Sequence, residues 1–402
     1  MIRDVQSRVQ TLGSVGAILL GGDIAYKGHP DEYKAAFEWV KELAEVCQCP
    51  LARVFVVPGN HDVDRDVITR SAAVRNVQSA IVSASPERRE RELRTQFRDA
   101  ETGRSLLAPL AAYNEFAKLF SCQVYSPEHL SWQQDLPLEG GLRLRIHGLT
   151  STLLCNANGQ KDSRGSLYLS PLQTVFDPIE NVVNLAMSHH PPDWFMDYDE
   201  VDDAICGRAS IHLFGHKHRQ RVLTDYGFIR FSAGALNPDR NEAAWDPAYN
   251  LIRLDVAGEY AERKLLIEAH LLKWQVNPEG YVPKQNPQGG YVFKHSILVP
   301  RQESATRVSD LVVLTDSRTT DGITKSAADV EAAMSDEETR DLIFRFWNLT
   351  SSQRREIALS LGLITDSELS LPEPERYGRA LLRAGEKNLI GKVAQAMSRL
   401  EN

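Results

Sequence analysis

Short apolar runs recur through the first three quarters of the chain, and several of them end in a polar motif. Ala17–Leu20 and Arg53–Val57 are two such runs, and residues 30–47 between them carry apolar side chains at helical spacing. Pro30 stands near the start of this helix, where proline is favoured because the first helical N–H groups lack partners. A strand, a helix and a second strand, with loops at the strand ends, predict an α/β fold.

Further strands are expected after an insertion. Residues 66–135 are charged and mostly helical in pattern, so we interpret them as a cap over the sheet. The strand rhythm then resumes, in apolar runs and alternating segments, at 142–146, 182–187, 211–214, 220–223, 228–231, 250–254 and 264–272. A hairpin carrying Pro287, Gly289 and Gly290 is expected after them.

The last hundred residues follow a different pattern. Residues 301–335 are rich in Ser, Thr and Asp with weak periodicity, which is typical of a linker. From 336 to 402 the pattern is helical, with a capping box at Thr350–Gln353 and two later helices. The chain is therefore predicted to hold a main domain over 1–300, a linker over 301–335 and a helical interaction domain over 336–402.

Composition and charge exclude several classes of protein. The 402 residues are 42% apolar and 25% charged, and no apolar run approaches the roughly 20 residues that span a bilayer. Arg3, Asp4 and Arg8 interrupt any signal-peptide core. The five cysteines are odd in number and scattered, so we expect a cytoplasmic protein without a membrane partner. The net charge of -8 disfavours a general nucleic-acid coat but leaves a local basic groove open.

Four polar motifs follow four predicted strands in chain order. They are Gly22-Asp23, Gly59-Asn60-His61-Asp62, His189-His190-Pro191-Pro192 and Gly215-His216-Lys217-His218. Ligand sites of open α/β sheets form outside the carboxyl ends of the strands, so the four motifs are expected to converge. Asp, Asn and His suit Mn, Fe, Zn and similar divalent ions. Each motif alone is typical of a turn or loop, but the four together predict a metal centre.

This set of motifs resembles that of the calcineurin-like metallophosphoesterase superfamily, over about residues 1–300. The resemblance implies a two-layer β-sandwich flanked by helices, with a small all-α domain after it. It also implies two divalent metal ions (Mn, Fe or Zn), bridged by a carboxylate and by a hydroxide that attacks phosphorus.

The same resemblance implies roles for individual residues. Asp23 is expected to bridge the metals, and the other expected ligands are Asn60, His189 and His216 on one metal and His218 on the other. His61 is expected beside the scissile phosphate, where it donates a proton to the leaving group or stabilises charge, with Asp62 orienting its ring. His189 is preferred to His190 because the family ligand is usually the first residue after the strand.

One motif of the family pattern is missing. The family opens with Asp-x-His at the end of its first strand, whereas upstream of Asp23 there is no histidine and the only aspartate is Asp4. Either the natural product has one more strand, or this chain is a degenerate half-site. We favour the first explanation because the downstream ligands are intact. The chain as given is expected to hold one metal well and the second poorly.

Two segments indicate a function. The cap and the Gly-Leu-Thr-Ser segment at 148–151 resemble the bacterial cyclic-nucleotide-phosphodiesterase-like branch, which implies a phosphodiester substrate, nucleotide or nucleic acid. The helical end, residues 346–400, resembles effector-associated adaptor domains of bacterial conflict systems, which implies a protein partner and a role in defence signalling. A generic dimerisation tail is the alternative for this end. The alternatives for the whole chain are a nuclease of the same superfamily and a non-catalytic scaffold.

Overall fold

The computed structural model describes residues 1–124, 129–237, 247–258 and 262–299, and residues 342–401 apart from 344, 348, 350, 366–367, 369–372 and 388. The chain separates into two compact units, Met1–Ala305 and Thr306–Asn402. The predicted linker at 301–335 lies outside the described residues. Each unit is therefore described by itself.

A six-stranded mixed sheet forms the centre of the first unit. Its strands stand in the order β3 (Ser131–Pro137), β4 (Arg143–Leu149), β5 (Val182–Ser188), β6 (Ile211–Phe214), β8 (Ile229–Ser232) and β7 (Arg221–Thr224). The inner pairs are parallel, whereas β3 and β7 are antiparallel edge strands. Every residue of β5 is buried, as expected for a parallel strand covered on both faces. This burial explains why the inner strands were visible as apolar runs.

Two smaller sheets complete this unit. β1 (Ile18–Leu20) and β2 (Val54–Val56) form a parallel pair joined through helix α2 (Pro30–Val46). The antiparallel sheet contains β9 (Ala248–Ala257), β10 (Lys264–Val276), β11 (Glu279–Pro283) and β12 (Phe293–Leu298). The predicted hairpin is wrong in detail, because β11 and β12 pair with successive stretches of the long strand β10 rather than with each other.

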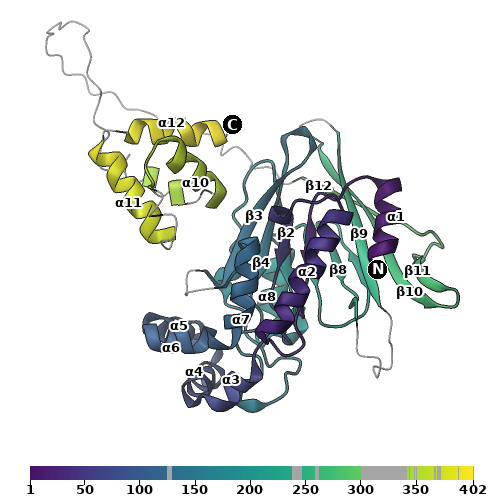
Figure 1. The fold of residues 1–402 in the computed structure, drawn as a ribbon, viewed down its shortest axis with the longest axis horizontal. Helices are drawn as coiled ribbons and strands as arrows, with labels where there is room; N and C mark the ends of the chain where they lie inside the picture. The colour runs from purple at the N-terminus through teal and green to yellow at the C-terminus, as the bar shows by residue number, and fades with distance from the viewer. Residues whose placement is uncertain are drawn as a thin grey trace, which may run out of the picture. The chain divides into compact units, whose positions relative to one another are not determined.

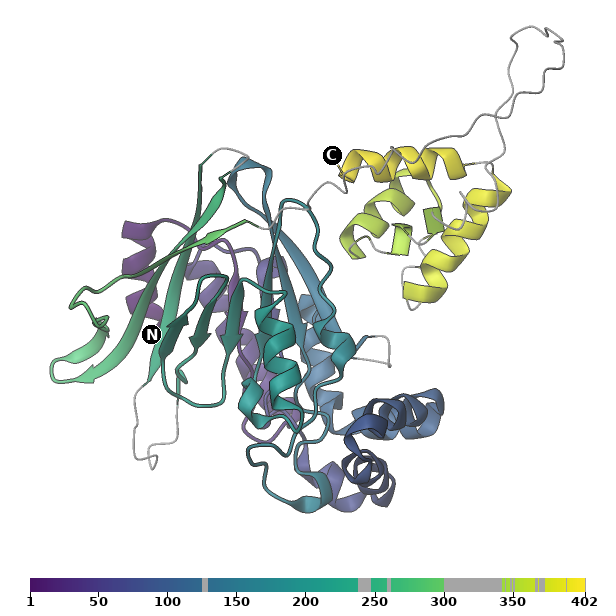
Figure 2. The same cartoon turned by 180° about the vertical axis from the view of Figure 1, so that it is seen from behind.

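Helices cover this unit on both sides. α1 (Ile2–Leu12) and α2 lie in the foreground of Figure 1, and α8 (Tyr198–Cys206) lies in the foreground of Figure 2, on the opposite side. The predicted architecture, α/β sheets flanked by helices followed by a helical C-terminal region, is confirmed. None of the described helices is long and apolar enough to cross a membrane.

The insertion after β2 is helical for most of its length. Its helices are α3 (Arg65–Arg70), α4 (Ala72–Ser83), α5 (Pro86–Arg98), α6 (Ala100–Leu107) and α7 (Ala111–Ala117). The predicted range 66–135 is too long at its end, because residues 131–135 belong to strand β3. Trp132 stands opposite Gly148 in that strand pair, and its indole donates to the carbonyl of Val56 at 3.0 Å. Residues 131–135 are mostly polar, and they form a strand because they pair with β4 at the edge of the sheet.

The second unit has its own apolar core. Its helices are α10 (Ser351–Ser360), α11 (Glu373–Glu386) and α12 (Ile390–Glu401). Phe346, Tyr377 and Met397 are among its buried side chains. The Arg354 guanidinium donates to two main-chain carbonyls, those of Trp347 and Leu349, each at 2.7 Å. Thr350, the predicted N-cap, lies outside the described residues.

We expect Phe346→Ala to unfold the second unit without unfolding the first. Removing this buried ring costs about 3–5 kcal/mol, comparable with the whole stability of so small a core. Hydrogen exchange read by mass spectrometry should show lost protection in α10–α12 and unchanged protection in β4–β6. Leu382→Ala is the matched control, because Leu382 is an exposed side chain of α11. Retained protection in α10–α12 of the Phe346 variant would contradict the expectation.

Two buried histidines make the first unit sensitive to acid. His147 donates from Nε2 to Asn184 at 3.0 Å, and His212 donates from Nε2 to the carbonyl of Ala209 at 2.8 Å. Burial lowers the pKa of each imidazole to about 4. In the unfolded chain the histidine pKa is about 6.5, so below that pH the unfolded chain binds more protons than the folded chain. The contribution of each neutral histidine to the free energy of unfolding is therefore fully present above about pH 6.5. It is lost as pH falls toward 4, by about 3 kcal/mol per histidine.

The measurement compares guanidinium unfolding at pH 7.5 and pH 5 for the wild type and His212→Gln. We expect the variant, which has lost one titrating group, to lose less stability between the two pH values. The exposed His29 provides the control variant His29→Gln, which should follow the wild type. An equal pH dependence of the free energy of unfolding in His212→Gln and the wild type would refute the conclusion that buried His212 makes the protein sensitive to acid.

Candidate metal centre

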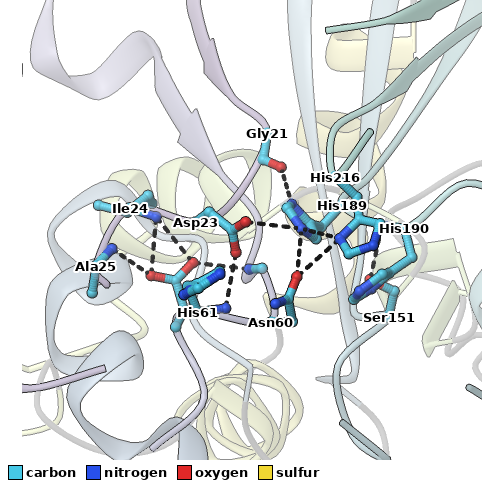
Figure 3. Close-up of polar contacts among 12 residues, drawn as sticks. Gly21, Asp23, Ile24, Ala25, Asn60, His61, Ser151, His189, His190 and His216 are labelled. Carbon is cyan, nitrogen blue, oxygen red and sulfur yellow. Dashed lines mark hydrogen bonds and ion pairs between the residues drawn. The ribbon is translucent and has the colours of Figure 1, made fainter. Parts of the chain in front are cut away.

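Four strand ends bring polar side chains to one place. Asp23 follows β1, Asn60 follows β2, His189 follows β5 and His216 follows β6 (Figure 3). β1 and β2 belong to the two-stranded sheet, and β5 and β6 belong to the six-stranded sheet. Residues that lie far apart in the sequence are therefore assembled only when these sheets pack together.

The four side chains bring one donor atom each close to a donor atom of a neighbour. Asn60 Oδ1 lies 2.9 Å from His216 Nδ1 and 3.1 Å from His189 Nε2. His189 Nε2 lies 3.3 Å from His216 Nδ1 and 3.3 Å from Asp23 Oδ2. Ligands bound at about 2.0–2.2 Å to one ion stand at such separations from each other. The spacing thus fits a divalent cation.

The chemistry of these atoms supports the same conclusion. His189 Nδ1 lies 2.8 Å from the carbonyl of Gly21, which can only accept, so Nδ1 carries the proton. In the neutral ring, Nε2 then presents a lone pair toward the oxygens of Asn60 and Asp23. Acceptor atoms that face one another repel unless a proton or a cation lies between them, so the cluster fits the metal ion that the sequence predicts.

Burial sets the protonation of the cluster. It lowers the pKa of His216 to about 3, assisted by repulsion from His189, and it lowers that of His190 well below the ordinary value. For His189 the nearby Asp23 outweighs burial, and the pKa is raised. For Asp23 burial opposes ionisation, but His189 and the N–H of His61 lower the pKa nonetheless. Burial therefore favours a neutral His216 beside the Asp23 carboxylate, and these are the forms that bind metals.

The backbone at the site adopts conformations that most residues avoid. Asp23, His216 and His218 have φ values of 55°, 62° and 48°, in the left-handed region. Such strain persists only where surrounding contacts hold it, and it is concentrated at functional sites. A Cβ on Gly22 would lie 2.6 Å from His189 Nδ1, and one on Gly59 would lie 2.2 Å from Asp23 Oδ1. Glycine is thus needed for the close approach of the two loops.

His61 lies beside the cluster and is held by a main-chain carbonyl. Its own N–H donates to Asp23 Oδ1 at 2.9 Å, which links it to the donor set. Its Nδ1 lies 2.9 Å from the carbonyl oxygen of Tyr26. Because a carbonyl accepts only, Nδ1 is the donor, and Nε2 is the nitrogen left to exchange a proton.

Asp62 does not act as the sequence suggested. The carboxylate was expected to orient the His61 ring, but it accepts instead from the N–H groups of Ala25, Ile24 and Gly59 at 2.8–3.2 Å. It also accepts from the Tyr33 hydroxyl at 2.9 Å. The loop after β1 supplies the N–H groups of Ile24 and Ala25, and helix α2 supplies the Tyr33 hydroxyl, whereas Gly59 lies in the same loop as Asp62. Asp62 therefore ties the two metal-site loops together, and Tyr26 orients the His61 ring.

The remaining histidines of the motifs take separate positions. His190 is fully buried, with Nδ1 2.9 Å from the Ser151 hydroxyl and Nε2 without a hydrogen-bond partner among the described residues. Its ligand atom lies within 4.8 Å of those of His189 and His216, so the structure adds His190 to the neighbourhood. His218 lies close enough to lower the pKa of His216 but is outside the four-atom cluster. Its role on a second metal stays a prediction.

The family comparison identifies the chain as a metal-dependent phosphoesterase. The family model of the calcineurin-like phosphoesterases matches residues 2–220, more than half of the chain. The chain belongs to this family, and it is a hydrolase of the kind that generally uses divalent metal ions. A second model, that of the GTPase-associated adaptor domain, matches residues 338–399.

Two solved structures are similar to this chain. One is Vps29 from Chaetomium thermophilum, 10% identical, with a TM-score of 0.28, over 73% of this chain and 89% of that one. The other is a 5'-nucleotidase from Staphylococcus aureus in complex with alpha-ketoglutarate, 10% identical, with a TM-score of 0.29. That match covers 77% of this chain and spans half of the nucleotidase. A search of curated proteins gives no match.

Proposed function

We propose that this chain is a phosphodiesterase that hydrolyses a nucleotide phosphodiester. The observation that supports it best is the convergence of four donor atoms at 2.9–3.3 Å, with the free nitrogen of His61 beside them. The family supplies the reaction class, and the cap and the 148–151 segment favour a diester and a nucleotide.

Each residue of the site has its own role in the proposed reaction. A divalent cation held by Asp23, Asn60, His189 and His216 would neutralise phosphoryl oxygens and bring the pKa of bound water toward about 7. In its imidazolium form His61 donates the Nε2 proton to the leaving oxygen and becomes the neutral ring, in which the Tyr26 carbonyl keeps Nδ1 protonated. Asp62 holds the loops of Asp23 and Asn60 in register. A second cation would use Asp23 and His218.

The first experiment measures hydrolysis of bis(p-nitrophenyl) phosphate and p-nitrophenyl phosphate by the full chain with manganese, together with metal bound per chain. We expect bound metal and a faster reaction with the diester. Faster hydrolysis of the monoester would replace the proposal with a phosphomonoesterase.

A non-catalytic phosphate-binding scaffold is the second candidate. The donor set described above serves one cation, and the Asp-x-His motif that the family uses for the other is not in this sequence. Bound metal and phosphate without turnover of either substrate would favour the scaffold.

The second unit supports the proposal of a protein partner. Residues 338–399 match an adaptor domain whose description refers to GTPases, so we infer that this unit recruits the phosphoesterase to a GTPase-containing system, in bacterial defence signalling. Affinity capture with the full chain should recover a partner that the Phe346→Ala chain loses. Equal recovery by both chains would count against recruitment through this unit.

A further inference from the structure

An exposed aromatic ring lies at the edge of the candidate metal centre. Tyr26 is 65% exposed, although it sits in the short loop between Asp23 and helix α2. Its ring stacks on that of His61, with 5.4 Å between centroids and 21° between planes. The ring is therefore one side chain away from the donor set, since His61 itself bonds to Asp23.

The loop that carries this ring is firmly held. The Glu32 carboxylate accepts from the N–H groups of Tyr26, Lys27 and His29 at 2.9–3.3 Å. The Tyr26 carbonyl accepts from His61 at 2.9 Å. These contacts fix the main chain at Tyr26, and stacking on His61 orients its ring, so the ring loses less freedom when something packs on it.

An exposed, preorganised ring beside a phosphate site can recognise a planar group. Base–aromatic stacking needs a ring face and tolerates any base, because every base has a π-face. His61 covers only part of the Tyr26 ring, as the exposure shows. The ring stacks on His61, whose main-chain N–H donates to Asp23, so it lies next to a residue that contacts the metal cluster.

We propose that Tyr26 is a specificity-determining residue that stacks on the nucleobase of a nucleotide whose phosphate lies at the metal cluster. The proposal rests on the function proposed above and deepens it. A base stacked on the Tyr26 ring would make the site select nucleotides over phosphoesters that lack a planar group. The Tyr26 carbonyl and the Tyr26 ring have separate tasks: the carbonyl orients His61, and the ring contacts the base.

The experiment measures binding rather than turnover. Adenosine monophosphate and ribose 5-phosphate, which share the phosphate and sugar but differ in the base, are titrated calorimetrically into the full manganese-loaded chain. We expect the wild type to bind adenosine monophosphate about tenfold more tightly. Tyr26→Leu, which keeps the main-chain carbonyl, should reduce this preference to within about twofold, and Tyr26→Phe should retain it.

Tyr226→Leu is the control, since Tyr226 is another exposed tyrosine, 81% exposed, in the turn between β7 and β8. It should leave the preference unchanged. The proposal is overturned if the wild type shows no preference, if neither compound binds, or if Tyr26→Leu keeps the preference. A chain that binds adenosine monophosphate through Tyr26 but hydrolyses neither nitrophenyl substrate would refute the phosphodiesterase function and leave this inference standing.

Discussion

His216→Ala is expected to lower kcat/KM for bis(p-nitrophenyl) phosphate by on the order of 10³-fold or more. The Nδ1 atom of His216 lies 2.9 Å from Asn60 and 3.3 Å from His189, so its loss opens the donor set on one side. The cation should then bind weakly, and the charge that stabilises the phosphoryl oxygens should be lost with it. Asn60→Ala, which removes the oxygen at the centre of the same contacts, should behave alike.

The measurement pairs steady-state kinetics with metal per chain by mass spectrometry. The control is His212→Gln, because His212 lies in the same strand β6 but bonds to Ala209. It should keep both metal and activity at neutral pH. Full activity in His216→Ala would contradict the assignment of His216 to the metal centre. Loss of bound metal with unchanged secondary structure would support it.

His61→Ala is expected to lower kcat for a cyclic nucleotide by about 10²–10⁴-fold while leaving metal bound. The four donor atoms that would hold the cation belong to other side chains, and the His61 N–H that bonds to Asp23 remains in the variant. What disappears is the imidazole that the Tyr26 carbonyl holds with Nδ1 protonated. Kinetics and metal content therefore separate this variant from His216→Ala.

The size of the defect should depend on the leaving group. A proton donor matters little for nitrophenolate, which leaves as an anion, and much for a ribose hydroxyl. We therefore expect a larger defect of His61→Ala with a cyclic nucleotide than with bis(p-nitrophenyl) phosphate. Equal defects with both substrates would mean that His61 stabilises charge in the transition state without donating a proton.

Much of the fold was accessible from local patterns. The buried inner strands β5 and β6 appeared as apolar runs because parallel strands covered on both faces hold few polar residues. The cap appeared as charged helical segments, but its end was misplaced. Residues 131–135 carry a polar edge strand, and only its pairing with β4 reveals it.

The sequence alone determined which chemistry-bearing residues stand at strand ends, and through them the family. A strand end is a local property, because the apolar run and the turn residue that closes it are neighbours in the chain. Motif order and residue type thus predicted Asp23, Asn60, His189 and His216 as members of one site, an assignment that the variants above will test.

Only the tertiary structure decided what these residues contact. Asp62 accepts hydrogen bonds from the loop after β1 rather than orienting the His61 ring. The main-chain carbonyl of Tyr26 orients that ring instead, and His190 lies fully buried beside the cluster. The partners in these contacts are main-chain N–H and carbonyl groups of segments distant in the chain, or side chains brought near by them. Every residue type except proline carries the same main-chain groups, so no local pattern marks which of them will be used. Their positions follow from how the two sheets pack, which the complete fold alone specifies.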